Sequence, residues 1–391
     1  MAGSELASDA RNLHQPVMLA QCLDMLAPAI AEPGAVLIDC TLGMGGHSEG
    51  ALERFNELTV IGIDRDADAI ALACERLSRF GSRFQAVHTT YDAVADVARA
   101  YGHHGTVDGI VMDLGASSYQ LDVRERGFSY AHDAPLDMRM DEDSSRTAAD
   151  IVREASQSEL ATLLRLYGEE RFAARIASRI VQRRAQSAIT TTGELADLVR
   201  AAIPAAARRT GGHPAKRTFQ ALRIAVNDEL TILERTLPRA IASLRVGGHI
   251  VVEAYHSLED RLVKEAFAAG LQSSTPAGLP VELAGHEPYL QALTKGALKA
   301  TPQEIESNPR SASVRIRAVR KIRSTDPAES TKPHQPYLAH AGESAYAPSL
   351  APSVAHSTAP SGARSAAASP AYSASTSNHL DDSDRYEGEQ A

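Results

Sequence analysis

Four short apolar runs alternate with amphipathic segments near the start of the chain. Of all the features of the sequence, this alternation most restricts the folds that the chain can adopt. Each run has the length of a buried β-strand, and the segments between them repeat apolar residues at helical spacing. Such strands pair in parallel and carry helices on both faces of their sheet, so we expect an α/β fold. The runs are residues 35–40 (AVLIDC), 59–64 (TVIGID), 84–91 (FQAVHTTY) and 107–115 (VDGIVMDLG).

The pattern changes twice further along the chain and predicts three parts. Residues 122–220 show helical periodicity without strands, so we expect a helical insertion, with Thr192 as the N-cap of one helix. Helix and strand patterns then resume, and we expect residues 1–121 and 221–323 to form the α/β domain together. Residues 324–391 are rich in Ala, Ser and Pro and cannot bury enough apolar surface to fold, so we expect a disordered tail.

A glycine-rich loop, DCTLGMGGHSEG, follows the first predicted strand. Its glycines Gly43, Gly45 and Gly46 lie at the carboxyl end of that strand, where open α/β sheets bind ligands. Asp64 ends the next strand and is placed to hold ribose hydroxyls, which indicates a ligand of the adenosine type.

The loop differs from the usual phosphate-binding patterns. Its glycines do not follow the G-x-G-x-x-G spacing of dinucleotide sites, and it lacks the G-K-[ST] of a P-loop. Asp39, four residues before the first glycine, would repel a pyrophosphate and suits a ligand with a cationic amine. We therefore expect S-adenosylmethionine as the cofactor. The alternative is a tight turn between strand and helix that binds no ligand.

Composition and charge exclude several other classes of protein. The formal net charge is −9, which on its own disfavours a nucleic-acid partner. The three cysteines form no C-x-x-C pair, so we expect reduced thiols in a cytoplasmic protein and no metal site. The first residues lack the basic and apolar regions of a secretory signal, and no apolar run is long enough to span a bilayer.

Several longer motifs carry a resemblance to a known family. They are HQPVML, TLGMGGHS, IGIDRD, DLGASSYQLD, RGFSY, PLDMRMD, YGEERFAARIA, HPAKRTFQALRI, VNDEL, HSLEDR and NPRSAS, between His14 and Ser313. The chain resembles the MraW/RsmH family, bacterial methyltransferases that act on the N4 amine of a cytidine in the decoding region of 16S ribosomal RNA. The resemblance implies a Rossmann-like methyltransferase fold that uses S-adenosylmethionine. It also implies a partner, the 16S RNA in the small ribosomal subunit or its assembly intermediate.

The resemblance assigns the adenosylmethionine contacts by position. They fall on Gly45, Gly46, His47, Asp64, Tyr91, Asp113 and Gln120. Three residues depart from the family pattern: Met44 where Arg is common, Tyr119 where Pro is usual, and Tyr255 where Phe is frequent. None of these departures removes a polar contact.

The implied chemistry needs an acceptor near the amine of cytosine. This amine is a poor nucleophile because its lone pair is delocalised into the ring, and an acceptor localises the lone pair and takes the proton. Asp113 ends the fourth predicted strand at the same edge of the sheet and is the candidate acceptor, with Ser117 and Ser118 orienting the base. His256 is a second catalytic candidate, and its alternative role is that of a structural histidine held by hydrogen bonds.

A cluster of basic residues in the predicted insertion indicates where RNA binds. Residues 165–217 contain eleven Lys and Arg against four Asp and Glu. The cluster includes Arg171, Arg175, Arg179 and Arg183, which recur every four residues and so share one face of a predicted helix, followed by Lys216 and Arg217. The alternative is an ordinary solvated helix face.

Two other functions stay open. A DNA amino-methyltransferase of the same fold normally carries an N/D/S-P-P-Y/F loop where this chain has DLGASS. An RNA-binding assembly factor of the small subunit would retain adenosylmethionine only for stability, and a turnover assay separates it from an enzyme. The sequence predicts neither the oligomeric state, a dimer included, nor a role for the tail.

Overall fold

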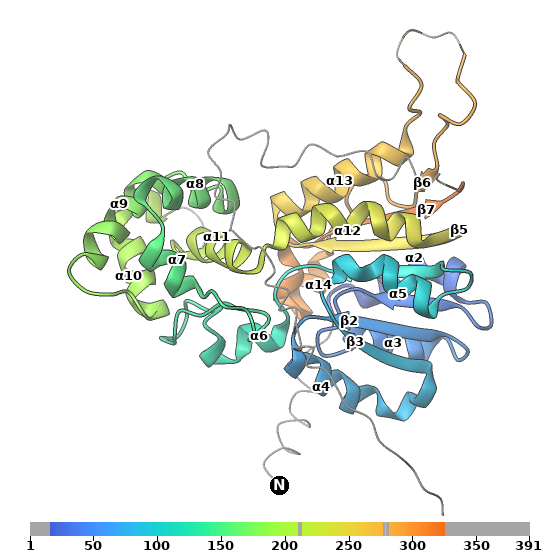
Figure 1. Cartoon of the computed structure of the whole chain (residues 1–391), viewed down its shortest axis with the longest axis horizontal. Coiled ribbons are helices and arrows are strands. Elements are labelled where there is room, and N and C mark those ends of the chain that lie inside the picture. The colour runs from blue at the N-terminus through green and yellow to red at the C-terminus, as the bar shows by residue number, and fades with distance from the viewer. Residues whose placement is uncertain (1–15, 210–212, 277, 279–280, 325–391) are drawn as a thin grey trace, which may run out of the picture. The chain divides into compact units, whose positions relative to one another are not determined.

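Seven strands form one sheet in the computed structural model, which describes residues 16–209, 213–276, 278 and 281–324 (Figure 1). The first five strands of the chain pair in parallel, whereas β7 pairs antiparallel with both its neighbours. This confirms the α/β fold and the mostly parallel sheet. In spatial order the strands are β3 (Phe84–His88), β2 (Thr59–Asp64), β1 (Val36–Asp39), β4 (Val107–Asp113), β5 (Leu244–Ala254), β7 (Arg315–Lys321) and the short β6 (Leu290–Ala292).

Helices cover both faces of this sheet, as the alternation of strands and helices predicts (Figure 1). Alternate strand residues point to opposite faces, so Leu37 and Val251 belong to one apolar cluster while Ile38 and Val252 belong to the other. The first cluster includes side chains of α2 (Leu19–Ile30), α3 (Gly46–Arg54) and α4 (Ala67–Leu77). The second includes side chains of α5 (Val94–Tyr101), α12 (Glu229–Ser243) and α13 (Ser257–Leu271).

Residues 118–227, between β4 and α12, are largely helical and have an apolar cluster of their own. The helices of this segment are α6 (Ser118–Asp122), α7 (Ala148–Glu154), α8 (Gln157–Gly168), α9 (Ala173–Arg184), α10 (Thr192–Ala202) and α11 (Lys216–Asn227), and one further helix, α14 (Pro302–Ser307), precedes β7. All the described residues nevertheless belong to one compact unit, so the predicted domain boundaries at 122 and 220 stay predictions.

The structure corrects three local expectations. The helical pattern of the sequence runs without a break over residues 158–185 and 219–244. Each of these predicted helices is broken by a residue in the left-handed region, Glu169 between α8 and α9 and Asp228 between α11 and α12. The N-cap of α10 is Thr191, which forms a capping box with Glu194, whereas Thr192 is the first helical residue. Thr192 instead donates its hydroxyl to His132 O at 2.8 Å.

Two further predictions concern membrane-spanning segments and the C-terminal tail. Among the described residues, no helix is both long and apolar enough to cross a membrane. The predicted tail lies outside the described residues beyond Ser324, so its disorder stays a prediction.

Candidate active site

A cavity of about 350 Å³ opens at the carboxyl edge of the sheet. The strand order reverses between β1 and β4, and open α/β sheets bind their ligands at such a reversal. Segments that follow each of the five parallel strands contribute to the wall, which includes Gly43, Asp64, Tyr91, Asp113 and Tyr255. The cavity therefore lies where the glycine loop and the strand-end acids predict it.

The glycines of the loop have separate roles. Gly43 and Gly45 have φ of 49° and 78°, in the left-handed region that favours glycine. A Cβ on Gly45 would lie 2.9 Å from Leu77 Cδ1, and one on Gly46 would lie 2.6 Å from Pro16 Cγ. Gly43 and Gly46 line the cavity, whereas Gly45 is the N-cap of α3 and is not among the lining residues. The first turn of α3, including Gly46, thus meets the cavity with backbone amides that have no partner inside the helix.

Asp64 is placed as the sequence predicts, with its carboxylate at the cavity wall. Its two oxygens accept the amide hydrogens of Gly43 at 2.7 Å and of Asp66 at 3.0 Å. Burial raises the pKa of Asp64 to about 6, and these hydrogen bonds partly offset the rise.

Asp39 does not have the role that its position suggests. Its side chain is buried, accepts the hydroxyl of Ser48 at 2.7 Å, and is not among the described residues that line the cavity. Asp39 therefore holds the loop rather than facing a cationic amine, and that expectation is wrong. The acids that reach the cavity are Asp64 and Asp113.

Asp113 lies at the end of β4 and faces the cavity. Its Oδ1 accepts the hydroxyl of Tyr255 at 2.6 Å, and its Oδ2 lies 3.7 Å from His47 Nδ1. Burial, followed by repulsion from Glu253, raises the pKa of Asp113 to about 7. The tyrosine that departs from the family pattern thus adds a hydrogen bond to the candidate acceptor.

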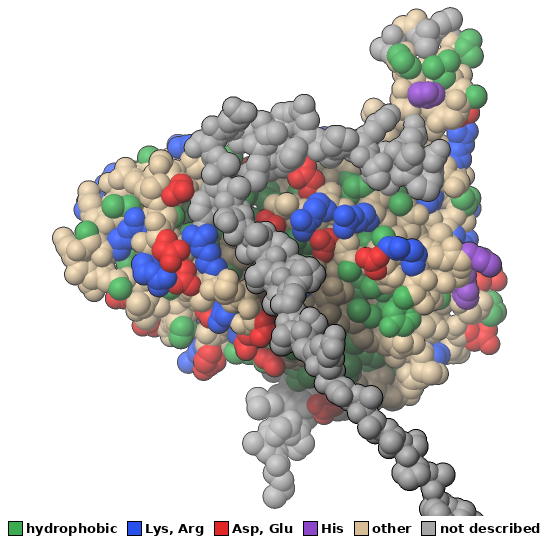
Figure 2. Space-filling model, viewed as in Figure 1, with side chains coloured by type: hydrophobic (Ala, Val, Ile, Leu, Met, Phe, Trp, Pro, Cys, Tyr) green, Lys and Arg blue, Asp and Glu red, His purple; other side chains and the backbone are tan. Residues whose placement is uncertain are grey.

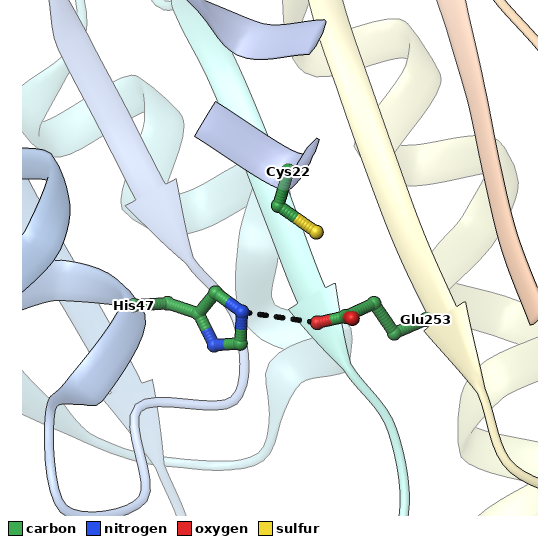
Figure 3. Close-up of side chains that lie close together, drawn as sticks. All are labelled: Cys22, His47 and Glu253. Carbon is green, nitrogen blue, oxygen red and sulfur yellow. Dashed lines mark ion pairs between the residues drawn. The ribbon is translucent and has the colours of Figure 1, made fainter. Parts of the chain in front are cut away.

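His47 lies in a buried cluster with Glu253 of β5 and Cys22 of α2 (Figure 3). Its Nε2 is 3.0 Å from Glu253 Oε2 and 3.2 Å from Val17 O. Burial alone lowers the pKa of His47, but Glu253, Cys22 and Asp113 outweigh it and raise the pKa well above its usual value. Sequence reasoning missed Glu253 and Cys22, although an acid inside the apolar strand HIVVEA was a usable signal.

The loop after β4 forms one side of the cavity. Ser117 is the N-cap of α6 in a capping box with Gln120, and both line the cavity. Gln120 Nε2 also donates to Asp66 Oδ2 at 2.8 Å, which ties this loop to the start of α4. Tyr91 also lines the cavity, and its hydroxyl donates to Glu229 O at 3.5 Å. The side chain of Ser118 lies outside the described part of the chain.

His256 has a structural role in this geometry. It is the N-cap of α13, its ring accepts the amide hydrogen of Glu259, and its Nε2 lies 3.1 Å from Glu259 Oε1. His256 is not among the described residues of the cavity wall. The geometry favours the hydrogen-bonded alternative over a catalytic role.

Only part of the predicted arginine row lies on one helix. Arg171 falls in the turn before α9, because the chain breaks at Glu169, so the prediction of four arginines on one helical face is wrong. Arg175 and Arg179 are exposed on α9. Arg183 belongs to the same helix but lies 3.5 Å from the carboxylate of Glu194.

Lys216 and Arg217 begin α11 and are exposed. Arg217 donates to Glu169 O at 2.9 Å. On the face drawn in Figure 2, basic and acidic side chains are interspersed over the helices between β4 and β5. On that face (Figure 2) the basic side chains of the described residues do not form a broad patch.

Comparisons with known proteins show the family of the chain. The model of the MraW methylase family matches residues 11–322. The chain is similar to the ribosomal RNA small subunit methyltransferase H of Beutenbergia cavernae, at 56% identity over 84% of this chain and 98% of the relative. It is also similar to the protein of that name from Kocuria rhizophila, at 54% identity over 81% and 96% of the two chains, and from Mycolicibacterium gilvum, at 58% over 79% and 83%. The chain therefore belongs to the MraW methylase family.

Proposed function

We propose that this chain transfers a methyl group from S-adenosylmethionine to the N4 amine of a cytidine in 16S ribosomal RNA. The observation that carries the proposal is the carboxylate of Asp113, which faces the cavity at the point where the strand order reverses. The relatives named above are ribosomal RNA small subunit methyltransferases, which supports the same substrate class. Such a substrate, in the small subunit or its assembly intermediate, places the chain in the cytoplasm.

The residues around the cavity fit adenosylmethionine. Asp64 places its carboxylate at the cavity wall, within reach of ribose hydroxyls. Tyr91 offers an aromatic face on the adenine side. Gly46 and His47 present the first turn of α3, where free backbone amides suit a carboxylate such as that of the methionine part. When bound, adenosylmethionine supplies a methyl group that its sulfonium already activates.

The chain then has to align the amine and accept its proton. Alignment alone lowers the barrier by several kcal/mol. Asp113, held by Tyr255, accepts a hydrogen from the amine and so directs its lone pair toward the methyl group. Ser117 lies beside the glycine loop, with its Cβ 3.7 Å from where a Cβ of Gly43 would be, and orients the base. A base inside folded RNA must leave its stack to reach this cavity.

The direct test is methylation by the purified chain. Small ribosomal subunits that lack the modification are incubated with the chain and labelled adenosylmethionine, and the RNA is digested to nucleosides. The proposal expects label in N4-methylcytidine. Binding of RNA and adenosylmethionine without turnover would support an assembly factor. Label in DNA, in a parallel reaction with unmethylated DNA, would support a DNA amino-methyltransferase.

Adenosylmethionine affinity is expected to depend on pH through Asp64. The hydroxyls of ribose donate to the ionised carboxylate, and the pKa of this group is about 6. Below that pH the ionised fraction falls about tenfold per unit, so Kd should rise about tenfold per unit below pH 6 and be flat above pH 7. Calorimetry of the wild type, Asp64→Asn and the exposed control Asp68→Asn measures this. A pH-dependent Kd that persists in Asp64→Asn would contradict the assignment.

We also propose that Arg175 and Arg179 contact RNA phosphates, since exposed like charges one turn apart suit a backbone and carry no sequence information. Each phosphate neutralised contributes roughly 0.7–0.9 to the slope of log affinity against log salt. Changing both residues to Gln should therefore flatten the slope by about 1.4–1.8 units and raise KM for RNA, with adenosylmethionine affinity unchanged. Arg99→Gln on α5 is the control. If the double variant is stable and its slope of log RNA affinity against log salt is unchanged, this face of α9 is an ordinary solvated helix face.

A further inference from the structure

Cys22, His47 and Glu253 come from three separate elements and meet in one buried place (Figure 3). The register of the sheet sets Glu253 opposite Asp113, and the alternation of β5 turns it, like Val251, toward the face that α2 and α3 cover. Glu253 and Cys22 have no exposed surface, and His47 is 7% exposed. One donor atom from each of the three side chains lies within 4.8 Å of the other two.

Among the described residues, Glu253 Oε1 has no polar partner and Oε2 has only the ion pair with His47. No hydrogen bond from these residues reaches either oxygen. His47 Nε2 approaches Oε2 to 3.0 Å but also lies 3.2 Å from Val17 O, so one ring nitrogen faces two oxygens. A buried carboxylate without hydrogen bonds is costly, and such groups are usually paired or coordinate a metal ion.

We propose that Cys22 Sγ, His47 Nε2 and Glu253 Oε2 form a site for a tetrahedral divalent metal ion of the zinc class. Thiolate, imidazole and carboxylate are the three donor types that zinc takes in proteins. Zinc bonds of about 2.0–2.3 Å put neighbouring donors roughly 3.3–3.7 Å apart, so shifts of about 1 Å close the site. The absence of a C-x-x-C pair does not exclude it, because the ligands are far apart in the sequence.

A carboxylate lies near the second ring nitrogen of His47, at a distance longer than a hydrogen bond. A ligating histidine usually directs its other ring nitrogen to a carboxylate, which fixes the tautomer that binds the metal. Here His47 Nδ1 lies 3.7 Å from Asp113 Oδ2, and Asp113 is itself held by Tyr255. Val17 O is near enough to Nε2 to supply the fourth position.

Charge balance favours a divalent ion at this depth. One thiolate and one carboxylate carry two negative charges, and a neutral imidazole adds none, so the loaded site has no net charge. The ion would clamp α2, α3 and β5 together beneath the glycine loop. The site shares His47 with the cavity wall and approaches the proposed acceptor Asp113 through His47 Nδ1, so metal binding is measured separately from methyl transfer.

Metal binding by the full chain tests the proposal. The protein is stripped with a chelator, mixed with Zn²⁺ or Co²⁺ and desalted, and bound metal is counted by mass spectrometry. We expect one ion per chain, a thiolate-to-cobalt charge-transfer band, and a melting temperature raised by Zn²⁺. Cys22→Ala should lose all three effects, Glu253→Gln should lose most of the affinity, and Cys74→Ala, at an exposed thiol, should keep them.

Three results would overturn the proposal. The first is that the stripped wild type, after incubation with metal, retains none after desalting. The second is that Cys22→Ala binds metal as the wild type does. In the third, metal binding survives Cys22→Ala but is lost in His256→Ala, which would place the ion at Glu229, His256 and Glu259 instead. If Cys22→Ala does not fold, metal binding by Glu253→Gln tests the proposal instead, because this substitution keeps the size of the side chain.

Discussion

Replacing Asp113 with asparagine is expected to lower kcat for methyl transfer by about 10²–10⁴-fold, the usual contribution of a positioned proton acceptor. Asparagine keeps the shape of the side chain and an oxygen that can accept the hydroxyl of Tyr255. In the wild type this hydroxyl donates to Asp113 at 2.6 Å. The substitution removes the negative charge that draws a hydrogen from the amine. The rate is measured in single turnovers at saturating adenosylmethionine, so that a change in cofactor affinity does not enter.

Two further variants separate this role from a structural one. Tyr255→Phe removes only the supporting hydrogen bond and should cost far less than the loss of the carboxylate. Asp96→Asn, at an exposed acid of α5, should leave the rate unchanged. If Asp113→Asn folds, binds adenosylmethionine and turns over at the wild-type rate, Asp113 is not the acceptor.

Arg126→Ala is expected to lower the free energy of unfolding by about 3–5 kcal/mol, the usual cost of removing one partner of a buried ion pair. Arg126 and Asp66 are buried, with Nη2 and Oδ2 2.9 Å apart. Asp66 is also the N-cap of α4 and accepts from Gln120 at the cavity wall. The substitution leaves that carboxylate without its countercharge and weakens both attachments.

Denaturant unfolding monitored by circular dichroism measures this loss. The control is Arg99→Ala, which removes an exposed arginine of α5 that pairs with Asp96 and should change stability by less than about 0.5 kcal/mol. Equal stabilities of the two variants would show that the Arg126–Asp66 pair contributes no more than a surface pair.

The sheet and the place of the site could be predicted because both depend on local patterns. Short apolar runs ending in Asp64 and Asp113 mark the carboxyl ends of parallel strands, and those ends meet at one edge. The break at Glu169 could not be predicted, since glutamate rarely adopts positive φ, whereas Asp228 is of a residue type that does so more often.

The direction of buried side chains could not be predicted either. Asp39 and Asp113 both end strands, yet Asp39 turns to Ser48 and Asp113 turns to the cavity. Cys22 and Glu253 are far apart in the sequence, and only the strand register and the packing of α2 on the sheet bring them together. Such contacts depend on tertiary structure rather than on spacing.

The modification of ribosomal RNA in cells tests the central claim most directly. Small-subunit RNA from cells that lack this chain, and from the same cells supplied with the wild type or with Asp113→Asn, is digested and mapped by mass spectrometry. We predict that one cytidine loses its N4-methyl group in the deletion, regains it with the wild type, and stays unmodified with Asp113→Asn. A full N4-methyl signal in cells that lack the chain would contradict the proposed function.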